Sequence, residues 1–80
     1  MNLPPDILKF LNKEAGRSNE TSIKPDENLF KVGALDSFSL FDLVSQLETA
    51  LAINISETEV TVENFQSVEA IERFLSSKFI

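Results

Sequence analysis

An apolar repeat in the middle of this chain limits its possible folds more than any other feature. Four residues recur at the period of one face of an α-helix: Leu40, Val44, Leu47 and Leu51. Asp36 precedes the repeat and is a favoured N-cap residue. The polar residues of the stretch are expected on other faces: Ser39, Asp42, Ser45, Gln46 and Thr49. The sequence therefore predicts a strong amphipathic helix that begins after Asp36 and ends near Leu51.

Two further helices are predicted near the ends of the chain. Pro4 and Pro5 suit a first helical turn, and apolar residues then recur up to a stop at Gly16: Ile7, Leu8, Leu11 and Ala15. Near the C-terminus, Ser67 is expected to cap a helix whose apolar residues point inward: Val68, Ile71, Phe74, Leu75 and Phe79.

The segments between these helices have weaker patterns. Residues 17–35 show no sustained period and predict a long loop, pinned to the core by its apolar residues: Ile23, Leu29, Phe30, Val32 and Leu35. Residues 53–55 alternate like a strand but are too short to build a sheet. After them one short irregular helix is expected, with either Ser56 and Glu59 as a capping box or Thr61 as the cap.

The predicted fold is an all-α, small four-helix bundle in one domain spanning residues 1–80. It has three main helices, one short helix and a long loop between the first two helices. Leu47 and Phe65 are expected in the core. Six phenylalanines are expected at or near inward-facing positions: Phe10, Phe30, Phe41, Phe65, Phe74 and Phe79. Phe38 has two open interpretations, an exposed partner contact or partial burial against the loop.

Composition excludes several classes of function. The chain has no Cys and no His, so thiolate metal sites, disulfides and Ser-His-Asp catalysis are ruled out. Its net charge of −6 disfavours nucleic acid and anionic membranes and favours basic protein surfaces. Apolar runs are too short for membrane insertion or a signal peptide, so a cytoplasmic location is expected. Five glutamates are interpreted as surface charge: Glu57, Glu59, Glu63, Glu69 and Glu72.

One segment suggests more specific chemistry. Gly33 permits a left-handed backbone shortly before Asp36 and Ser37. The Ser37 hydroxyl is expected at the helix N-terminus, beside unpaired backbone N–H groups and the positive end of the helix dipole. A phosphate ester on that oxygen would be favoured electrostatically. Taken alone, however, an Asp-Ser pair is most simply an ordinary helix cap.

The order of these motifs resembles the acyl carrier protein family, whose members are acidic four-helix bundles with a Gly-x-Asp-Ser-Leu signature. The matching segments are residues 25–30, 33–38, 40–51, 53–55, 63–65 and 67–71. By this resemblance Ser37 would carry 4′-phosphopantetheine taken from coenzyme A, and Asp36 would be read by the modifying transferase. The thiol of the arm would hold an acyl or aminoacyl group as a thioester, on a protein that is not itself an enzyme.

Departures from the signature refine this resemblance. Phe38 stands where the signature has Leu, an extra residue separates Gly33 from Asp36, and Glu48 is not followed by further acids. The chain therefore resembles discrete specialised or D-alanyl-type carriers more than the primary fatty-acid carrier. The cargo stays open among fatty acyl, polyketide and amino acid.

The same resemblance implies the partners. They are a phosphopantetheinyl transferase, an acyl- or aminoacyl-activating ligase and downstream acyl-processing enzymes, and the carrier itself is expected to be a monomer. Four residues are the candidate contacts: Phe38, Phe41, Asp42 and Glu48. The alternative is an unmodified acidic helical adaptor that acts only by docking onto a partner protein.

Overall fold

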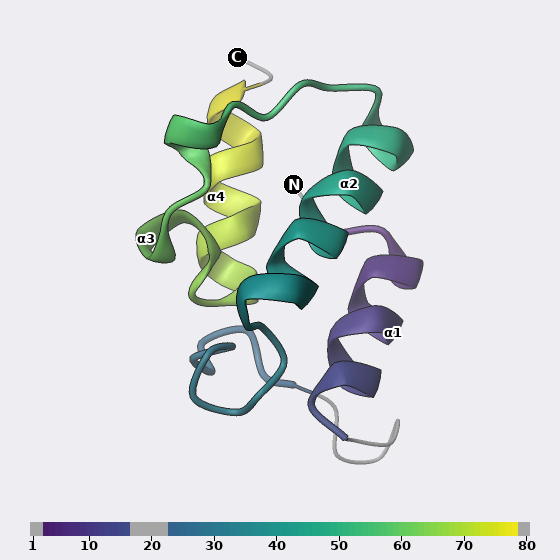
Figure 1. Cartoon of the computed structure of the whole chain (residues 1–80), viewed down its shortest axis with the longest axis vertical. Helices are drawn as coiled ribbons and strands as arrows, with labels where there is room; N and C mark the ends of the chain where they lie inside the picture. Colours follow the sequence, from purple (N-terminus) through teal and green to yellow (C-terminus); the bar gives the residue numbers. More distant parts are fainter. Residues whose placement is uncertain (1–2, 17–22, 79–80) are drawn as a thin grey trace.

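The structure is a computed structural model and describes residues 3–16 and 23–78. Within these ranges it contains helices and turns but no strand (Figure 1). The elements are α1 (Pro5–Glu14), α2 (Ser37–Leu51), the 3₁₀ turn η2 (Glu57–Glu59), α3 (Val62–Phe65) and α4 (Val68–Lys78). The predicted arrangement of three main helices and one short helix is confirmed.

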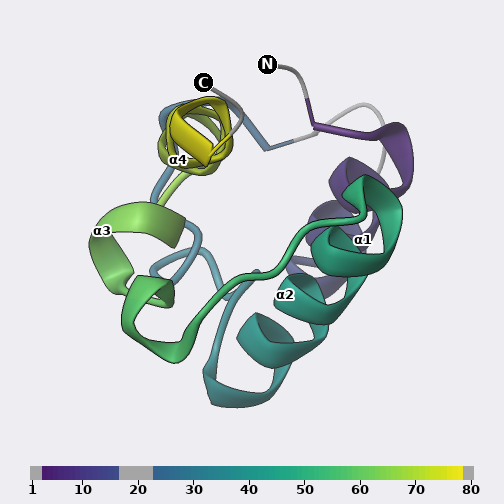
Figure 2. The ribbon, with the colours of Figure 1, turned by 90° about the horizontal axis from the view of Figure 1, so that it is seen from above.

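The helices form two pairs around one core. α1 packs beside α2, and α3 packs beside α4. Figure 2 shows the two pairs facing each other, and Figure 1 shows the loop that precedes α2 at the lower end of the bundle, next to the start of α2. The bundle is thus closed by this loop rather than by a full-length helix.

Helix α1 begins and ends where the sequence predicts. Pro4 is its N-cap, and Gly16, just after its end, has a φ of 70°, a left-handed conformation that glycine adopts readily. Ile7 and Leu11 are buried on its inner face, while Leu8 is partly exposed. Leu3, just before the helix, is also buried and donates its N–H to Glu72 of α4 at 3.2 Å.

Helix α2 is rotated slightly from the predicted orientation. Its buried residues are Ser39, Leu43, Val44 and Leu47, so Val44 and Leu47 lie inward as predicted, whereas Leu40 and Leu51 are only half-buried. The expectation that Ser39 faces away is therefore wrong. A polar side chain is tolerated there because its hydroxyl hydrogen-bonds within the cap of the helix.

Backbone hydrogen bonds attach the loop before α2 to the rest of the fold at two points. Leu29 is fully buried, and its N–H donates to the carbonyl of Gln66 at 2.7 Å. The carbonyl of Pro25 in turn accepts from Glu69 of α4 at 3.0 Å. The described part of the predicted loop is thus pinned to the core, as expected; residues 17–22 lie outside the described ranges.

A 3₁₀ turn, η2, and a short helix, α3, connect α2 to α4. Ser56 and Glu59 form a capping box around η2, and Thr61 separately caps α3 by accepting from the N–H of Asn64 at 3.2 Å. The one short helix that the sequence predicts is α3, and the Ser56–Glu59 capping box, expected as an alternative to the Thr61 cap, is present as well and forms the additional turn η2.

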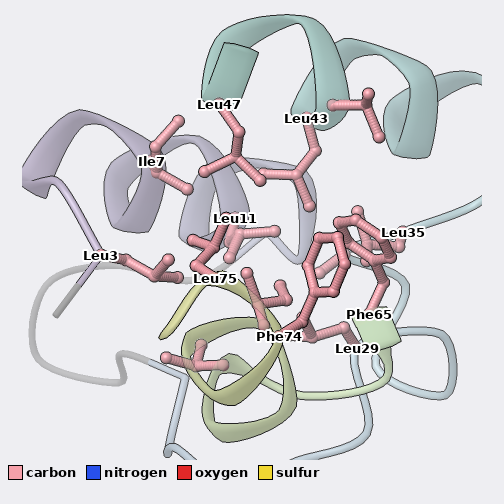
Figure 3. Packing of buried hydrophobic residues seen from close by; sticks show 14 of the residues in the cluster. Leu3, Ile7, Leu11, Leu29, Leu35, Leu43, Leu47, Phe65, Phe74 and Leu75 are labelled. Atoms are coloured by element: carbon pink, nitrogen blue, oxygen red, sulfur yellow. The ribbon is translucent and has the colours of Figure 1, made fainter. Parts of the chain in front are cut away.

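The core gathers apolar side chains from all four helices and the loop (Figure 3). Leu47 and Phe65 have no exposed surface, which confirms both as core residues. The Phe65 ring lies 5.6 Å from that of Phe74 in a tilted arrangement. The prediction for Phe41 is wrong: it points outward with 65% of its surface exposed. Phe79 lies outside the described residues.

Candidate functional site

Ser37 occupies the first position of α2, where the pinned loop passes into the helix. Its side chain is exposed, and no described residue forms a hydrogen bond with its hydroxyl. Asp36, the residue before it, is also exposed and is the N-cap. The expected hydroxyl at a helix start is therefore present, on a surface that another protein can reach.

The cap itself uses the backbone groups beside Ser37. Asp36 Oδ1 accepts from the N–H groups of Phe38 and Ser39, each at 2.9 Å. These two bonds, that from Ser39 first, hold the pKa of Asp36 below its ordinary value. The expectation of unpaired N–H groups beside Ser37 is therefore wrong for Phe38 and Ser39, and the Asp36 charge offsets the helix dipole that would favour a phosphate there.

Ser39 completes the cap from the buried side. Its Oγ accepts from the Asp36 N–H at 2.8 Å and lies 3.2 Å from the carbonyl oxygen of Ala34. Sequence reasoning missed this residue. The signal was available, because a polar side chain three residues after an N-cap Asp is the spacing of a capping box.

Gly33 and the buried loop residues set the approach to the site. Gly33 has a φ of 82°, which confirms the expected left-handed backbone. Ala34 and Leu35 follow it, almost completely buried, and their N–H groups both donate to the carbonyl of Leu29, at 2.9 and 3.1 Å. The backbone that leads to Ser37 is thus fixed by burial in the core and by hydrogen bonds to Leu29.

Two aromatic rings stand exposed next to Ser37. Phe38 is 83% exposed and Phe41 is 65% exposed, three positions apart on α2, so they share one side of the helix. The interpretation of Phe38 as partly buried is therefore excluded. Water-exposed rings of this size are typical of surfaces that contact partner proteins.

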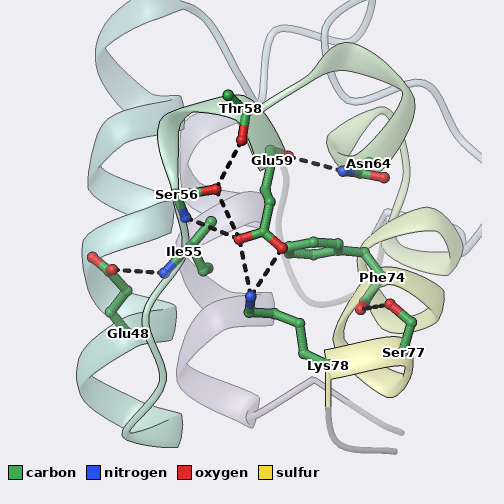
Figure 4. Close-up of polar contacts among 9 residues, drawn as sticks. All are labelled: Glu48, Ile55, Ser56, Thr58, Glu59, Asn64, Phe74, Ser77 and Lys78. Carbon is green, nitrogen blue, oxygen red and sulfur yellow. Dashed lines mark hydrogen bonds and ion pairs between the residues drawn. The ribbon is translucent and has the colours of Figure 1, made fainter.

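The two predicted acidic contacts differ in their surroundings. Asp42 is exposed near the start of α2, beside Phe41. Glu48 lies about 16 Å from Ser37 along the helix axis, is half-buried, and accepts from the Ile55 N–H at 2.9 Å (Figure 4). The structure therefore brings Asp36, Ser37, Phe38 and Asp42 into one region and leaves Glu48 at the other end.

Charge is unevenly distributed along the chain. Residues 1–31 hold equal numbers of acidic and basic residues, whereas residues 32–72 contain no Lys or Arg. That second stretch carries only acids: Asp36, Asp42, Glu48, Glu57, Glu59, Glu63, Glu69 and Glu72. The candidate site thus lies in the segment that accounts for the negative charge of the protein.

Two of these glutamates are structural rather than simple surface charges. Glu59 accepts both from the Ser56 N–H and from Lys78 Nζ, each at 2.9 Å, and these bonds lower its pKa. Lys78 Nζ also lies 5.6 Å from the centre of the Phe74 ring (Figure 4). Glu72 accepts from Leu3, as noted above. The surface interpretation is therefore incomplete for Glu59 and Glu72, whereas Glu57, Glu63 and Glu69 are exposed as expected.

The described residues offer little other chemistry. They include no group of three or more carboxylates placed to hold a metal ion. None of the described helices combines the length and apolar character needed to cross a membrane. The exposed hydroxyl of Ser37 on a fixed backbone is therefore the candidate reactive group, and the carboxylate next to it, that of Asp36, is used in the helix cap.

The chain is similar to known proteins along most of its length. The sequence profile of the phosphopantetheine attachment site family matches residues 6–75. Aminoacyl carrier protein 1 of Bradyrhizobium diazoefficiens is 36% identical over 56 residues, a match that covers 70% of this chain and 61% of that relative. The match thus spans less than two thirds of the relative's length.

Two crystal structures of Bradyrhizobium japonicum glycine:[carrier protein] ligase complexes contain similar chains. In the complex with the cognate carrier protein and an analogue of glycyl adenylate, the match has 31% identity and a TM-score of 0.70, and covers 89% of this chain and 87% of that one. In the complex with glycylated carrier protein, the match has 32% identity and a TM-score of 0.67, and covers 85% and 86% of the two chains.

Proposed function

Since the chain belongs to the phosphopantetheine attachment site family, as a protein of the acyl carrier type, we propose that it acts as a non-catalytic carrier. It holds an acyl or aminoacyl group as a thioester and presents that group to partner enzymes. The observation that carries the proposal is the exposed hydroxyl of Ser37 on a fixed backbone, within the segment that the family profile matches.

We propose Ser37 as the attachment residue. Its oxygen forms a bond to the phosphorus that bears the pantetheine part of coenzyme A, while the bond from that phosphorus to adenosine 3′,5′-bisphosphate breaks. The hydroxyl proton passes to a base of the transferase, because this chain has no His and the carboxylate next to Ser37, that of Asp36, is a weak base with a lowered pKa that is used in the helix cap. Once attached, 4′-phosphopantetheine supplies the thiol that a chain without Cys lacks.

We assign Asp36 to recognition by the transferase as well as to the helix cap. All described hydrogen bonds of its carboxylate involve Oδ1, and none uses Oδ2. The cap holds the carboxylate in one orientation, ionised at neutral pH because its pKa is lowered. An oriented, exposed carboxylate beside the nucleophile is a feature that a basic or metal-containing partner site can read.

Mass spectrometry tests the attachment. Incubated with coenzyme A, Mg²⁺ and a broad-specificity phosphopantetheinyl transferase, the protein should gain one phosphopantetheinyl group. Ser37→Ala should abolish that gain while changing the free energy of unfolding by only about 0.5 kcal/mol, since the side chain is exposed. Ser45→Ala, an exposed serine of the same helix, is the matched control and should be modified normally.

A wild-type protein that stays unmodified with several transferases would contradict the carrier function. The alternative, an acidic adaptor that docks without an arm, would then be favoured. The exposed Phe38 and Phe41 rings support such docking as well as they support the carrier, so the modification experiment separates the two functions.

For the loading partner we propose an amino acid:carrier protein ligase, and for the cargo an amino acid. The support is the similarity to carrier chains in the glycine:[carrier protein] ligase complexes and to an aminoacyl carrier protein. The test supplies the modified protein with ATP, such a ligase and single amino acids, and measures thioester formation. Loading by a fatty-acyl ligase but by no amino acid ligase would contradict this choice.

The proposed contact surface comprises Phe38, Phe41 and Asp42 beside Ser37, together with Glu48 further along α2. Its two rings offer apolar area at the centre, and its acids attract a basic partner over a distance. A transferase, the ligase and downstream acyl-processing enzymes would use this surface in turn.

Three broader expectations stay predictions. The single domain of residues 1–80, the monomeric state and the cytoplasmic location can be checked by limited proteolysis, by light scattering of the purified protein and by cell fractionation, respectively.

A further inference from the structure

We propose that Ser39 is a positioning residue for the modification of Ser37, an inference that rests on the proposed carrier function. Ser39 is the one polar residue that is buried among the residues the structure describes, with 7% of its surface exposed. It lies two positions after Ser37, in the interior beneath the exposed start of α2. A buried hydroxyl at that place needs partners, and those partners flank the nucleophile.

The hydrogen bonds of Ser39 close a ring around Ser37. Oγ accepts from the Asp36 N–H at 2.8 Å, and its own proton is shared between the Ala34 carbonyl oxygen and Asp36 Oδ1, both at 3.2 Å. The Ser39 N–H also donates to Asp36 Oδ1 at 2.9 Å. Ser39 is thus hydrogen-bonded to Asp36, one residue before Ser37, and to Ala34, three residues before it. Ser37 lies between these residues and Ser39, so its backbone is held on both sides.

This ring is anchored to the core and not to another surface loop. Ala34 is fully buried, and its N–H donates to the carbonyl of Leu29 at 2.9 Å. Leu29 in turn donates its N–H to Gln66, the C-cap of α3, at 2.7 Å. Through Ser39, the start of α2 is therefore connected to the far helix pair by a continuous series of short hydrogen bonds.

The position of the Ser37 oxygen matters because position is what this chain contributes to the reaction. The new oxygen–phosphorus bond forms as the bond to adenosine 3′,5′-bisphosphate breaks, so the hydroxyl must lie in line with the leaving group. A misplacement of about 1 Å in such a reaction costs roughly a hundredfold in rate. A looser ring should therefore reduce kcat, whereas KM should hold because the exposed rings that contact the partner are unchanged.

The test compares modification kinetics of the full-length protein and its variants below their unfolding temperatures. Ser39→Ala should lower kcat roughly tenfold, with KM within about twofold of wild type. Ser39→Thr, which keeps the hydroxyl, should restore most of the rate. If Ser39→Ala does not fold, Ser39→Cys keeps the volume while weakening the hydrogen bonds, and it should show the same loss of kcat.

Ser67→Ala is the matched control for stability. Ser67 Oγ accepts from the Ala70 N–H at 3.0 Å and so caps α4 without touching the Ser37 segment. It should lower the unfolding temperature but leave kcat unchanged. A second measurement, amide hydrogen exchange of the unmodified protein, should show faster exchange at the Asp36 N–H in Ser39→Ala and not in Ser67→Ala.

Several outcomes would overturn the proposal. They are modification of Ser39→Ala at the wild-type kcat, a loss that falls wholly on KM, and a loss of rate in Ser67→Ala as large as that in Ser39→Ala; each result would reduce Ser39 to a stabilising residue. A wild-type protein that no transferase modifies is a different failure: it removes the carrier function, and the positioning role with it. Normal modification of wild type together with unaffected Ser39 variants removes the positioning role alone.

Discussion

The start and the end of α2 are formed by different kinds of residue. At its start, a favoured cap residue, a buried serine and a glycine with a φ of 82° hold Ser37 in place. At its end, the chain leaves the helix through Ala52, a residue other than glycine, at a φ of 54°. Glu48 then reaches across the turn to the Ile55 N–H at 2.9 Å. The start uses residues that suit their conformations, while the end forces alanine into a left-handed one.

This contrast indicates different roles for the two ends of α2. The start holds one residue in a fixed position, and the end connects the helix to the next segment. Under the proposed function, the start of α2 presents one hydroxyl to other proteins, which requires a fixed backbone. The end of α2 only has to lead the chain toward η2, and a strained residue there is tolerated because Ile53 and Ile55 pack against or within the core. The following predictions test whether the two ends are as different as their hydrogen bonds suggest.

The largest effect is expected in the middle of the helix. Leu47→Ala removes a fully buried side chain and should lower the free energy of unfolding by about 2–5 kcal/mol, measured by urea denaturation. Amide exchange should accelerate at both ends of α2, because both depend on the same core. Leu8→Ala, on the half-exposed face of α1, should cost far less. Acceleration at one end alone would show that the two ends are separate units.

Charge reversal should distinguish the two acidic residues of α2. Asp42→Lys should slow modification several-fold at low salt and less at high salt, because it weakens steering toward a basic partner. Glu48→Lys should also destabilise the protein by about 1–3 kcal/mol, since the Ile55 N–H loses its acceptor. Transferase kinetics at two ionic strengths and thermal unfolding measure both effects.

Phe38→Ala serves as the counterpart of these variants, since it should weaken the docked complex with little dependence on salt. Unchanged rates for both charge reversals would remove α2 acids from the recognition surface and leave only the exposed rings.

A pair of glycine and alanine exchanges should have opposite signs at the two ends. Ala52→Gly relieves a left-handed alanine and should stabilise the protein by about 0.5–1 kcal/mol. Gly33→Ala should destabilise it by about 1 kcal/mol through backbone strain alone, because an added Cβ would meet no atom within 4 Å. Denaturation midpoints measure both, and equal signs would show that φ does not govern these positions.

The smallest effect concerns acid. The pKa of Asp36 in the folded protein lies below its ordinary value of 3.8, so the cap contributes stability that is present above that value and is lost as the pH falls below it. Asp36→Asn should remove this part of the acid sensitivity. The measurement is the unfolding midpoint of both proteins from pH 6 to pH 3, and identical slopes would contradict a contribution from the cap.

The sequence predicts the elements whose signals are local. Helix α2 and its cap follow from a repeat and one residue that precedes it, and Ser37 follows from its place beside that cap. The predictions fail where a long-range contact decides. Lys78 binds Glu59 across 19 positions, which no local pattern indicates. Ser39, expected on the surface, is buried, and Phe41, expected in the core, is exposed. The reason is that packing against α1 and the loop, and not hydrophobicity alone, decides which face of α2 is buried.

The uneven charge described above has a consequence for the protein in a crowded solution. Since residues 32–72 carry acids and no base, two copies that meet through their α2 surfaces repel each other and cannot form ion pairs within that stretch. Self-association through α2 would therefore have to overcome this repulsion, despite the exposed aromatic rings beside Ser37.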